Sequence, residues 1–236
     1  TTSDSAVASM KTKMESVESL VKKAITDTTS SDSKVTIADE IESYKNAIYS
    51  LANSNTSGQY LFSGNSSSTQ AFQKDATTGK ITYIATNDNK SVNVETGSYT
   101  TQGVNGIELL YYTNNTAQAG EDLTFDENEN ILDKNGNQYK LLDNDNDGSF
   151  DGLYLNGDSS NTPLTVTDNG DGSFTVNNAG TTALQSKYSI FDDLDKIINA
   201  LKQQDSSGNT ITEDEATTLL SDALSTVTNA YDTMNI

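Results

Sequence analysis

The start of the chain carries two runs of apolar residues that alternate steps of three and four positions. The first run consists of Val7, Met10, Met14, Val17, Val21 and Ala24. The second run consists of Ile37, Ile41, Tyr44, Ile48 and Leu51, and the polar Asn55 continues its spacing. This spacing places the apolar side chains on one face of a helix, where they pack against a second helix. We expect the second helix to begin at a capping box formed by Thr36 and Asp39 and to end at Gly58.

Helical spacing returns in two further runs near the end of the chain. The first consists of Ile190, Leu194, Ile197, Ile198 and Leu201, with Ser189 and Asp192 as its expected cap. The second consists of Ala216, Leu220, Ala223, Val227, Ala230 and Met234, with Thr212 and Glu215 as its capping box. Since every apolar face needs a partner, we expect the two ends of the chain to pack into one helical bundle.

The stretch between these helices has the composition of strands and turns. Thirteen of the fifteen Gly and the single Pro, Pro163, lie between Ser63 and Ala183. Short apolar or alternating runs predict strands at 80–84, 91–94, 107–112, 138–142, 164–167 and 173–176. The last two flank Asn169-Gly170-Asp171-Gly172, which is typical of a β-hairpin turn. The sequence therefore predicts an α+β fold: a discontinuous helical bundle of residues 1–62 and 184–236, with an inserted antiparallel β domain of residues 63–183.

The amino-acid composition excludes several classes of function. The chain has no Cys, His or Trp, and all fourteen of its basic residues are Lys. The chain therefore has no thiol nucleophile, no imidazole base and no bidentate Arg side chain. Paired carboxylates such as Asp192 and Asp193 act as acid and base only beside an apolar pocket, and nothing in the neighbouring sequence indicates one. A net charge of -20 disfavours binding to nucleic acid and to anionic membranes. No apolar run reaches the ~18 residues of a membrane span. We expect a protein that is not an enzyme.

One acidic loop matches the start of a calcium-binding loop. Asp143, Asp145, Asp147 and Asp151 occupy positions one, three, five and nine, and Gly148 occupies position six. Position twelve is Tyr154, where a bidentate Glu is expected. Two alternatives follow: a Ca²⁺ site, or an acidic solvated turn between strands with no cofactor in the protein.

The segment Tyr60-Leu61-Phe62-Ser63-Gly64 follows the second helical run directly. We expect Tyr60, Leu61 and Phe62 to be buried as a wedge where the two domains meet, with Gly64 permitting the turn. Together with Gly79 to Tyr83 (G-K-I-T-Y) and Ile190 to Leu194 (I-F-D-D-L), this segment resembles the flagellin superfamily, and within it the hook-associated protein 3 family of hook-filament junction proteins. The resemblance covers about residues 36–112 and 188–236, and residues 115–182 match nothing in it.

The resemblance implies a structural subunit of the bacterial flagellum that joins hook to filament. Its implied partners are identical subunits, a neighbouring hook-associated protein and flagellin, with an export chaperone contacting a terminus. Its implied location is extracellular, after export by the flagellar secretion apparatus. The heptad helices that end such proteins are missing here, and the sequence has no initial Met, so we expect a fragment that is monomeric in solution.

Two alternatives stay open. The first is a flagellin, the filament subunit, although flagellins usually read F-N-G where this chain has Tyr60-Leu61-Phe62-Ser63-Gly64. The second is a secreted calcium-dependent adhesin or carbohydrate-binding module, in which the β domain carries the function and the helices form a stalk.

Overall fold

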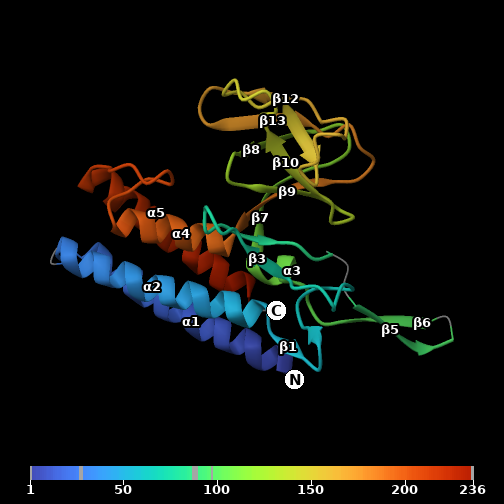
Figure 1. The fold of residues 1–236 in the computed structure, drawn as a ribbon, viewed down its shortest axis with the longest axis horizontal. Helices are drawn as coiled ribbons and strands as arrows, with labels where there is room; N and C mark the ends of the chain where they lie inside the picture. Colours follow the sequence, from blue (N-terminus) through green and yellow to red (C-terminus); the bar gives the residue numbers. More distant parts are fainter. Residues whose placement is uncertain (1, 27–28, 87–89, 97, 235–236) are drawn as a thin grey trace. The chain divides into compact units, whose positions relative to one another are not determined.

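The chain folds into two compact units in the structure, a computed structural model that describes residues 2–26, 29–86, 90–96 and 98–234 (Figure 1). Unit 1 comprises Thr1–Tyr111 and Ile190–Ile236, and unit 2 comprises Tyr112–Ser189. The helices, all in unit 1, are α1 (Thr2–Ile25), α2 (Ser31–Ala52), α3 (Gly106–Leu110), α4 (Ile190–Leu201) and α5 (Glu213–Thr233). The strand pairs whose registers are described are all antiparallel. The predicted α+β class is confirmed.

Four long helices of unit 1 form a closed ring. Helix α1 packs on α2, α2 on α4, α4 on α5, and α5 again on α1 (Figure 1). The predicted runs supply most of its core, from Met10, Met14, Val17 and Val21 in α1 to Ala216, Leu220, Val227 and Ala230 in α5. In α2, however, Lys45 is buried where the predicted pattern had Tyr44. Segments from both ends of the chain thus bury each other's apolar faces, as their spacing requires.

Three helix ends differ from prediction. Helix α2 begins at Ser31 because Ser30 caps it, its hydroxyl accepting the N–H of Ser33, while Thr36 only donates within the helix to the carbonyl of Asp32. The same helix ends at Ala52, and Gly58 instead supplies a positive φ of 82° to the turn between two short strands. Ser189 does not cap α4, because its buried hydroxyl has no partner among the described residues. The Thr212 and Glu215 capping box is confirmed.

Unit 1 also contains three antiparallel strand pairs. These are β1 (Asn55–Thr56) with β2 (Gln59–Tyr60), β3 (Phe72–Lys74) with β4 (Ile81–Tyr83), and β5 (Lys90–Glu95) with β6 (Ser98–Gln102). The expected strand at 107–112 is wrong for its first four residues: residues 106–110 form α3, because Asn105 and Glu108 make a capping box, and the strand begins at Tyr111. The apolar run Ile107 to Leu110 favours a strand on composition alone, but a satisfied cap starts a helical turn.

Gly106 lies against the aromatic side chains of β3 and β4. A Cβ atom at this position would come within 2.6 Å of Cε2 of Phe72 and 2.9 Å of Cε2 of Tyr83. Both rings are almost completely buried and cannot move aside easily. We expect Gly106→Ala to destabilise unit 1 by about 1–3 kcal/mol, as overpacked cores do. Chemical denaturation measures this loss.

Unit 2 consists of two antiparallel sheets. Its strands are β7 (Tyr111–Ala117), β8 (Asp122–Asp126), β9 (Asn130–Asp133), β10 (Gln138–Leu142), β11 (Gly152–Leu155), β12 (Val166–Asp168), β13 (Ser173–Asn177) and β14 (Leu184–Ser189). One sheet has the order β11-β10-β9-β14-β7, and the other β12-β13-β8. The β12–β13 hairpin and strand β10 are where the sequence placed them. Buried residues of both sheets, including Ile131, Leu153, Phe125 and Phe174, form one core.

The boundaries between the compact units differ from the domain boundaries predicted from the sequence, which were 62/63 and 183/184. In the structure the chain passes between units at 111/112 and 189/190. Residues after 62 belong to unit 1 because they pack on its helices. The ring of Phe72 packs edge to face on that of Phe191 in α4, with 5.3 Å between the ring centroids. The side-chain amide of Asn53, which caps the end of α2, also exchanges two hydrogen bonds with the backbone of Phe72.

Candidate functional site

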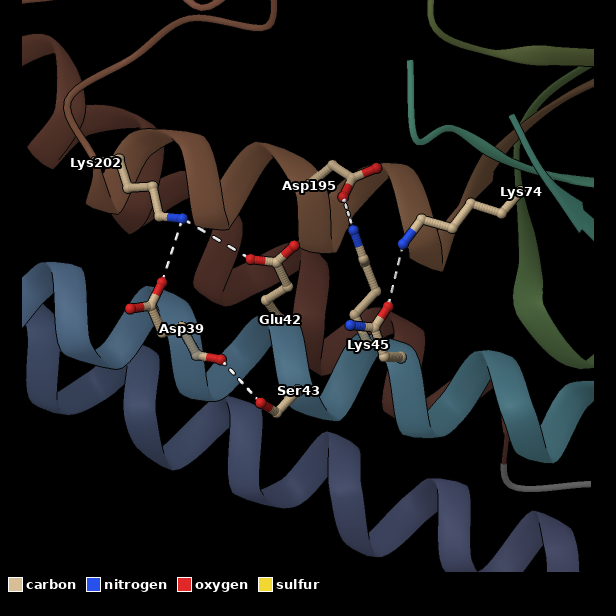
Figure 2. Close-up of polar contacts among 8 residues, drawn as sticks. Asp39, Glu42, Ser43, Lys45, Lys74, Asp195 and Lys202 are labelled. Atoms are coloured by element: carbon tan, nitrogen blue, oxygen red, sulfur yellow. Dashed lines mark hydrogen bonds and ion pairs between the residues drawn. The ribbon is translucent and has the colours of Figure 1, made fainter. Parts of the chain in front are cut away.

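A polar seam of ion pairs joins α2 to α4. Nζ of Lys45 donates to Oδ1 of Asp195 at 2.6 Å (Figure 2). The Lys45 side chain is 7% exposed and that of Asp195 is 32% exposed. Moving an ammonium group out of water is costly unless a carboxylate takes the place of that water. The pair links the two halves of the chain, since α2 comes from the first half and α4 from the second.

A second set of ion pairs continues this seam toward the end of α4. Nζ of Lys202 lies 3.3 Å from Oδ1 of Asp39 and 3.8 Å from Oε2 of Glu42, both on α2 (Figure 2). These side chains are partly exposed, so each contact contributes about 0–1 kcal/mol. The sequence analysis missed the seam. The available signal was Lys45 itself, which stands four residues after Ile41 and three before Ile48, in the spacing of the buried face.

The expected interdomain wedge lies within unit 1. Phe62 is completely buried, Tyr60 and Leu61 are half-buried, and Gly64 has a positive φ of 58°. The carbonyl of Phe62 accepts the N–H of Gly106 at 2.9 Å. The segment therefore ties the strands after α2 to the start of α3.

Three carboxylates of the acidic loop converge. Asp143, Asp145 and Asp151 each offer an oxygen, and these oxygens lie within 4.8 Å of one another; among the described residues this is the one such acidic group, and Asp147 is not part of it. The loop also uses these carboxylates internally. Asp143 accepts the N–H groups of Asp147 and Gly148, and Asp151 accepts that of Asn144. These hydrogen bonds close the acidic turn on itself.

The charges within this loop oppose one another. A hydrogen bond from the backbone of Asp147 lowers the pKa of Asp145, but slight desolvation and the neighbouring carboxylates of Asp147, Asp151 and Asp143 outweigh it and leave that pKa raised. We expect Asp145→Asn to raise the melting temperature slightly, since Asn can still accept the Asp147 N–H while the repulsion is removed.

We also expect calorimetric titration of the unaltered chain to show no Ca²⁺ binding at millimolar concentration. Binding that Asp145→Asn abolishes would contradict this expectation.

A buried carboxylate holds the turn between β8 and β9. Oε2 of Glu129 accepts the N–H of Asp126 at 2.7 Å, and its Oε1 accepts an amide N–H of Asn114 at 2.8 Å. Burial raises the pKa of Glu129 despite these hydrogen bonds. The carboxyl group of Glu129 therefore binds a proton more tightly in the folded chain than in the unfolded chain.

The sign of the pH effect follows from linkage. Because the folded pKa of Glu129 is raised, its contribution to stability is largest below its unfolded value and is lost as pH rises through the folded value. We expect the free energy of unfolding of unit 2 to fall over this interval more steeply in the unaltered chain than in Glu129→Gln. Comparing the two proteins cancels the other carboxylates, and parallel pH profiles would assign the fall to those groups instead.

The fold and its polar contacts define the class of protein. It is an α+β protein whose bundle is built from both ends of the chain, with an inserted antiparallel β unit. Among the described residues, no helix is both long and apolar enough to cross a membrane.

The chain is similar in fold to solved structures of flagellar proteins. FlgL of Xanthomonas campestris, in two crystal forms, is similar with TM-scores of 0.59 and 0.60 at 17% and 20% identity, covering 99% of this chain and 81% of that protein. The flagellar junction protein FlgL of Legionella pneumophila is similar with a TM-score of 0.52 at 16% identity, over 99% of this chain and 88% of that one. The sequence matches no protein-family model and no curated protein. At these identities the likeness establishes a shared fold.

Proposed function

We propose that this chain is a subunit of the junction between hook and filament in the bacterial flagellum. The observation that carries the proposal is the likeness of almost the whole chain, both units included, to flagellar junction proteins. The resemblance of Tyr60 to Gly64 and Ile190 to Leu194 to hook-associated protein 3 is independent support. In this role the protein is extracellular and works by packing, without a catalytic step or a cofactor.

Its partners in this proposal are identical subunits beside it, and a hook-associated protein and flagellin along the axis. The outer surfaces of α1 and α5 suit lateral packing. The hydroxyls of Thr12, Ser16, Thr218 and Thr228 each donate to the backbone carbonyl four residues earlier. Because these hydroxyls are already satisfied, covering them with a neighbouring helix costs less than burying free ones.

Deletion of the gene in its own bacterium tests the proposal. We expect hooks without filaments and loss of swimming, with both restored by the unaltered gene. Normal filaments in the deletion strain would overturn the junction role. Hooks that carry the junction but no filament, seen by electron microscopy, would instead identify a flagellin, because a filament subunit is needed only beyond the junction.

A further inference from the structure

Four Asn-Gly pairs occur in the chain, at 105–106, 135–136, 156–157 and 169–170. An Asn followed by Gly is prone to lose its side-chain amide, because the following backbone nitrogen is not shielded by a Cβ atom. That nitrogen attacks Cγ of Asn, the Cγ–Nδ2 bond breaks, and ammonia leaves with the proton from the attacking nitrogen. Water then opens the cyclic imide to Asp or isoaspartate. The reaction consumes one water and requires the Asn side chain to turn toward the backbone.

The four Asn-Gly pairs differ in the hydrogen bonds that hold the Asn side chain. Asn105 is completely buried, and its Oδ1 accepts the N–H groups of Ile107 and Glu108, each at 3.0 Å. Asn169 is exposed, but its Nδ2 donates to the hydroxyls of Ser173 at 2.9 Å and Thr175 at 3.0 Å. In both pairs the ring cannot close until these hydrogen bonds break.

Asn135 and Asn156 are held much less. Both are exposed, and within the described part of the chain neither side chain makes a hydrogen bond. Their main-chain atoms are ordered in tight turns: the N–H of Gly136 donates to the carbonyl of Asp133, and that of Gly157 to the carbonyl of Tyr154. The N–H of Asn135 also donates to the Asp133 carboxylate, and that of Asn156 to the carbonyl of Gln138, but these contacts hold the backbone and leave each Asn side chain able to turn.

We infer that Asn135 and Asn156 are sites of spontaneous deamidation, whereas Asn105 and Asn169, in the same dipeptide, are protected by their side-chain hydrogen bonds. Each conversion adds one negative charge to unit 2. At Asn135 the new charge appears beside Asp133, whose carboxylate accepts the N–H groups of Asn135 and Asn137 and so shapes the β9–β10 turn. An isoaspartate would also lengthen the backbone of that turn by one methylene.

Peptide mapping by mass spectrometry tests the inference on the intact chain. The protein is incubated at neutral pH and 37 °C, folded or in denaturant, and conversion is followed at all four sites. In denaturant we expect comparable rates, since each Asn precedes Gly. In the folded chain we expect Asn105 and Asn169 to slow at least ~10-fold more than Asn135 and Asn156, because two hydrogen bonds must break first. Equal slowing at the four sites, or faster conversion at Asn169 than at Asn135, would overturn the inference.

A variant isolates the cause of protection. The double change Ser173→Ala and Thr175→Val removes both hydroxyls that hold Asn169, and both positions lie on one strand of a surface hairpin. We expect Asn169 then to convert at about the folded rate of Asn135. Thr124→Val is the matched control, since Thr124 contacts Thr175 across β8 and β13 but not Asn169. No acceleration in the double variant would refute protection by these hydrogen bonds.

Discussion

Phe72→Ala is expected to destabilise unit 1 by about 3–5 kcal/mol, the range for removing a buried aromatic ring. Phe72 is completely buried, and its ring contacts those of Tyr83, Tyr111 and Phe191 at centroid distances of 5.3, 6.4 and 5.3 Å. Truncation removes three aromatic contacts and leaves a cavity between β3 and α4. Denaturant unfolding measures the loss.

Two controls make this prediction specific. Phe72→Leu keeps most of the buried volume and should lose clearly less. Phe150→Ala removes a partly buried ring that packs edge to face on Phe174 in unit 2, so it should weaken protection from hydrogen exchange in unit 2 and leave unit 1 unchanged. A loss below ~1 kcal/mol for Phe72→Ala would show that strands β3 and β4 do not depend on packing against the helices.

The sequence predicted the bundle well because periodicity reports burial directly. All five apolar residues predicted for α4 are buried, and so are five of the six predicted for α5. It failed where a local polar contact decided the structure. Ser30 started α2 earlier than the Thr36 pattern indicated, and the cap formed by Asn105 and Glu108 turned an expected strand into α3.

The division into units could not be read from composition. Residues 63–111 have the Gly and polar content of the β region, yet Phe72, which packs on Tyr83, also packs on Phe191, more than a hundred residues later in the chain. Such pairings between distant segments leave no periodic signal. In the acidic loop the spacing of the carboxylates was visible in the sequence. Only the structure shows that the loop's own N–H groups use these carboxylates and that Asp147 is not one of the three whose oxygens converge.

The ion pair of Lys45 and Asp195 is expected to respond very differently to the loss of each partner. Asp195→Ala leaves an ammonium group buried between α2 and α4 without its acceptor, and breaking a buried pair in this way costs about 3–5 kcal/mol. Because Asp195 is 32% exposed, water can reach the site, and we expect a loss near the lower end, about 3 kcal/mol. Lys45→Met replaces the lysine with an unbranched apolar chain and leaves Asp195 to be hydrated, so its stability should stay within about 1.5 kcal/mol of the unaltered protein.

Denaturant unfolding of both variants and of the double variant gives the coupling energy between the two residues. If Lys45→Met loses as much as Asp195→Ala, the pair itself stabilises the bundle. If the expected asymmetry is found, the pair contributes little net stability, and its effect is to select one alignment of α2 against α4. A shift of either helix along the other would separate the ammonium group from its carboxylate, at a cost that apolar side chains do not impose. In the proposed junction role, this contact would fix the alignment between the two halves of the chain that form the bundle, and therefore the surface presented to neighbouring subunits.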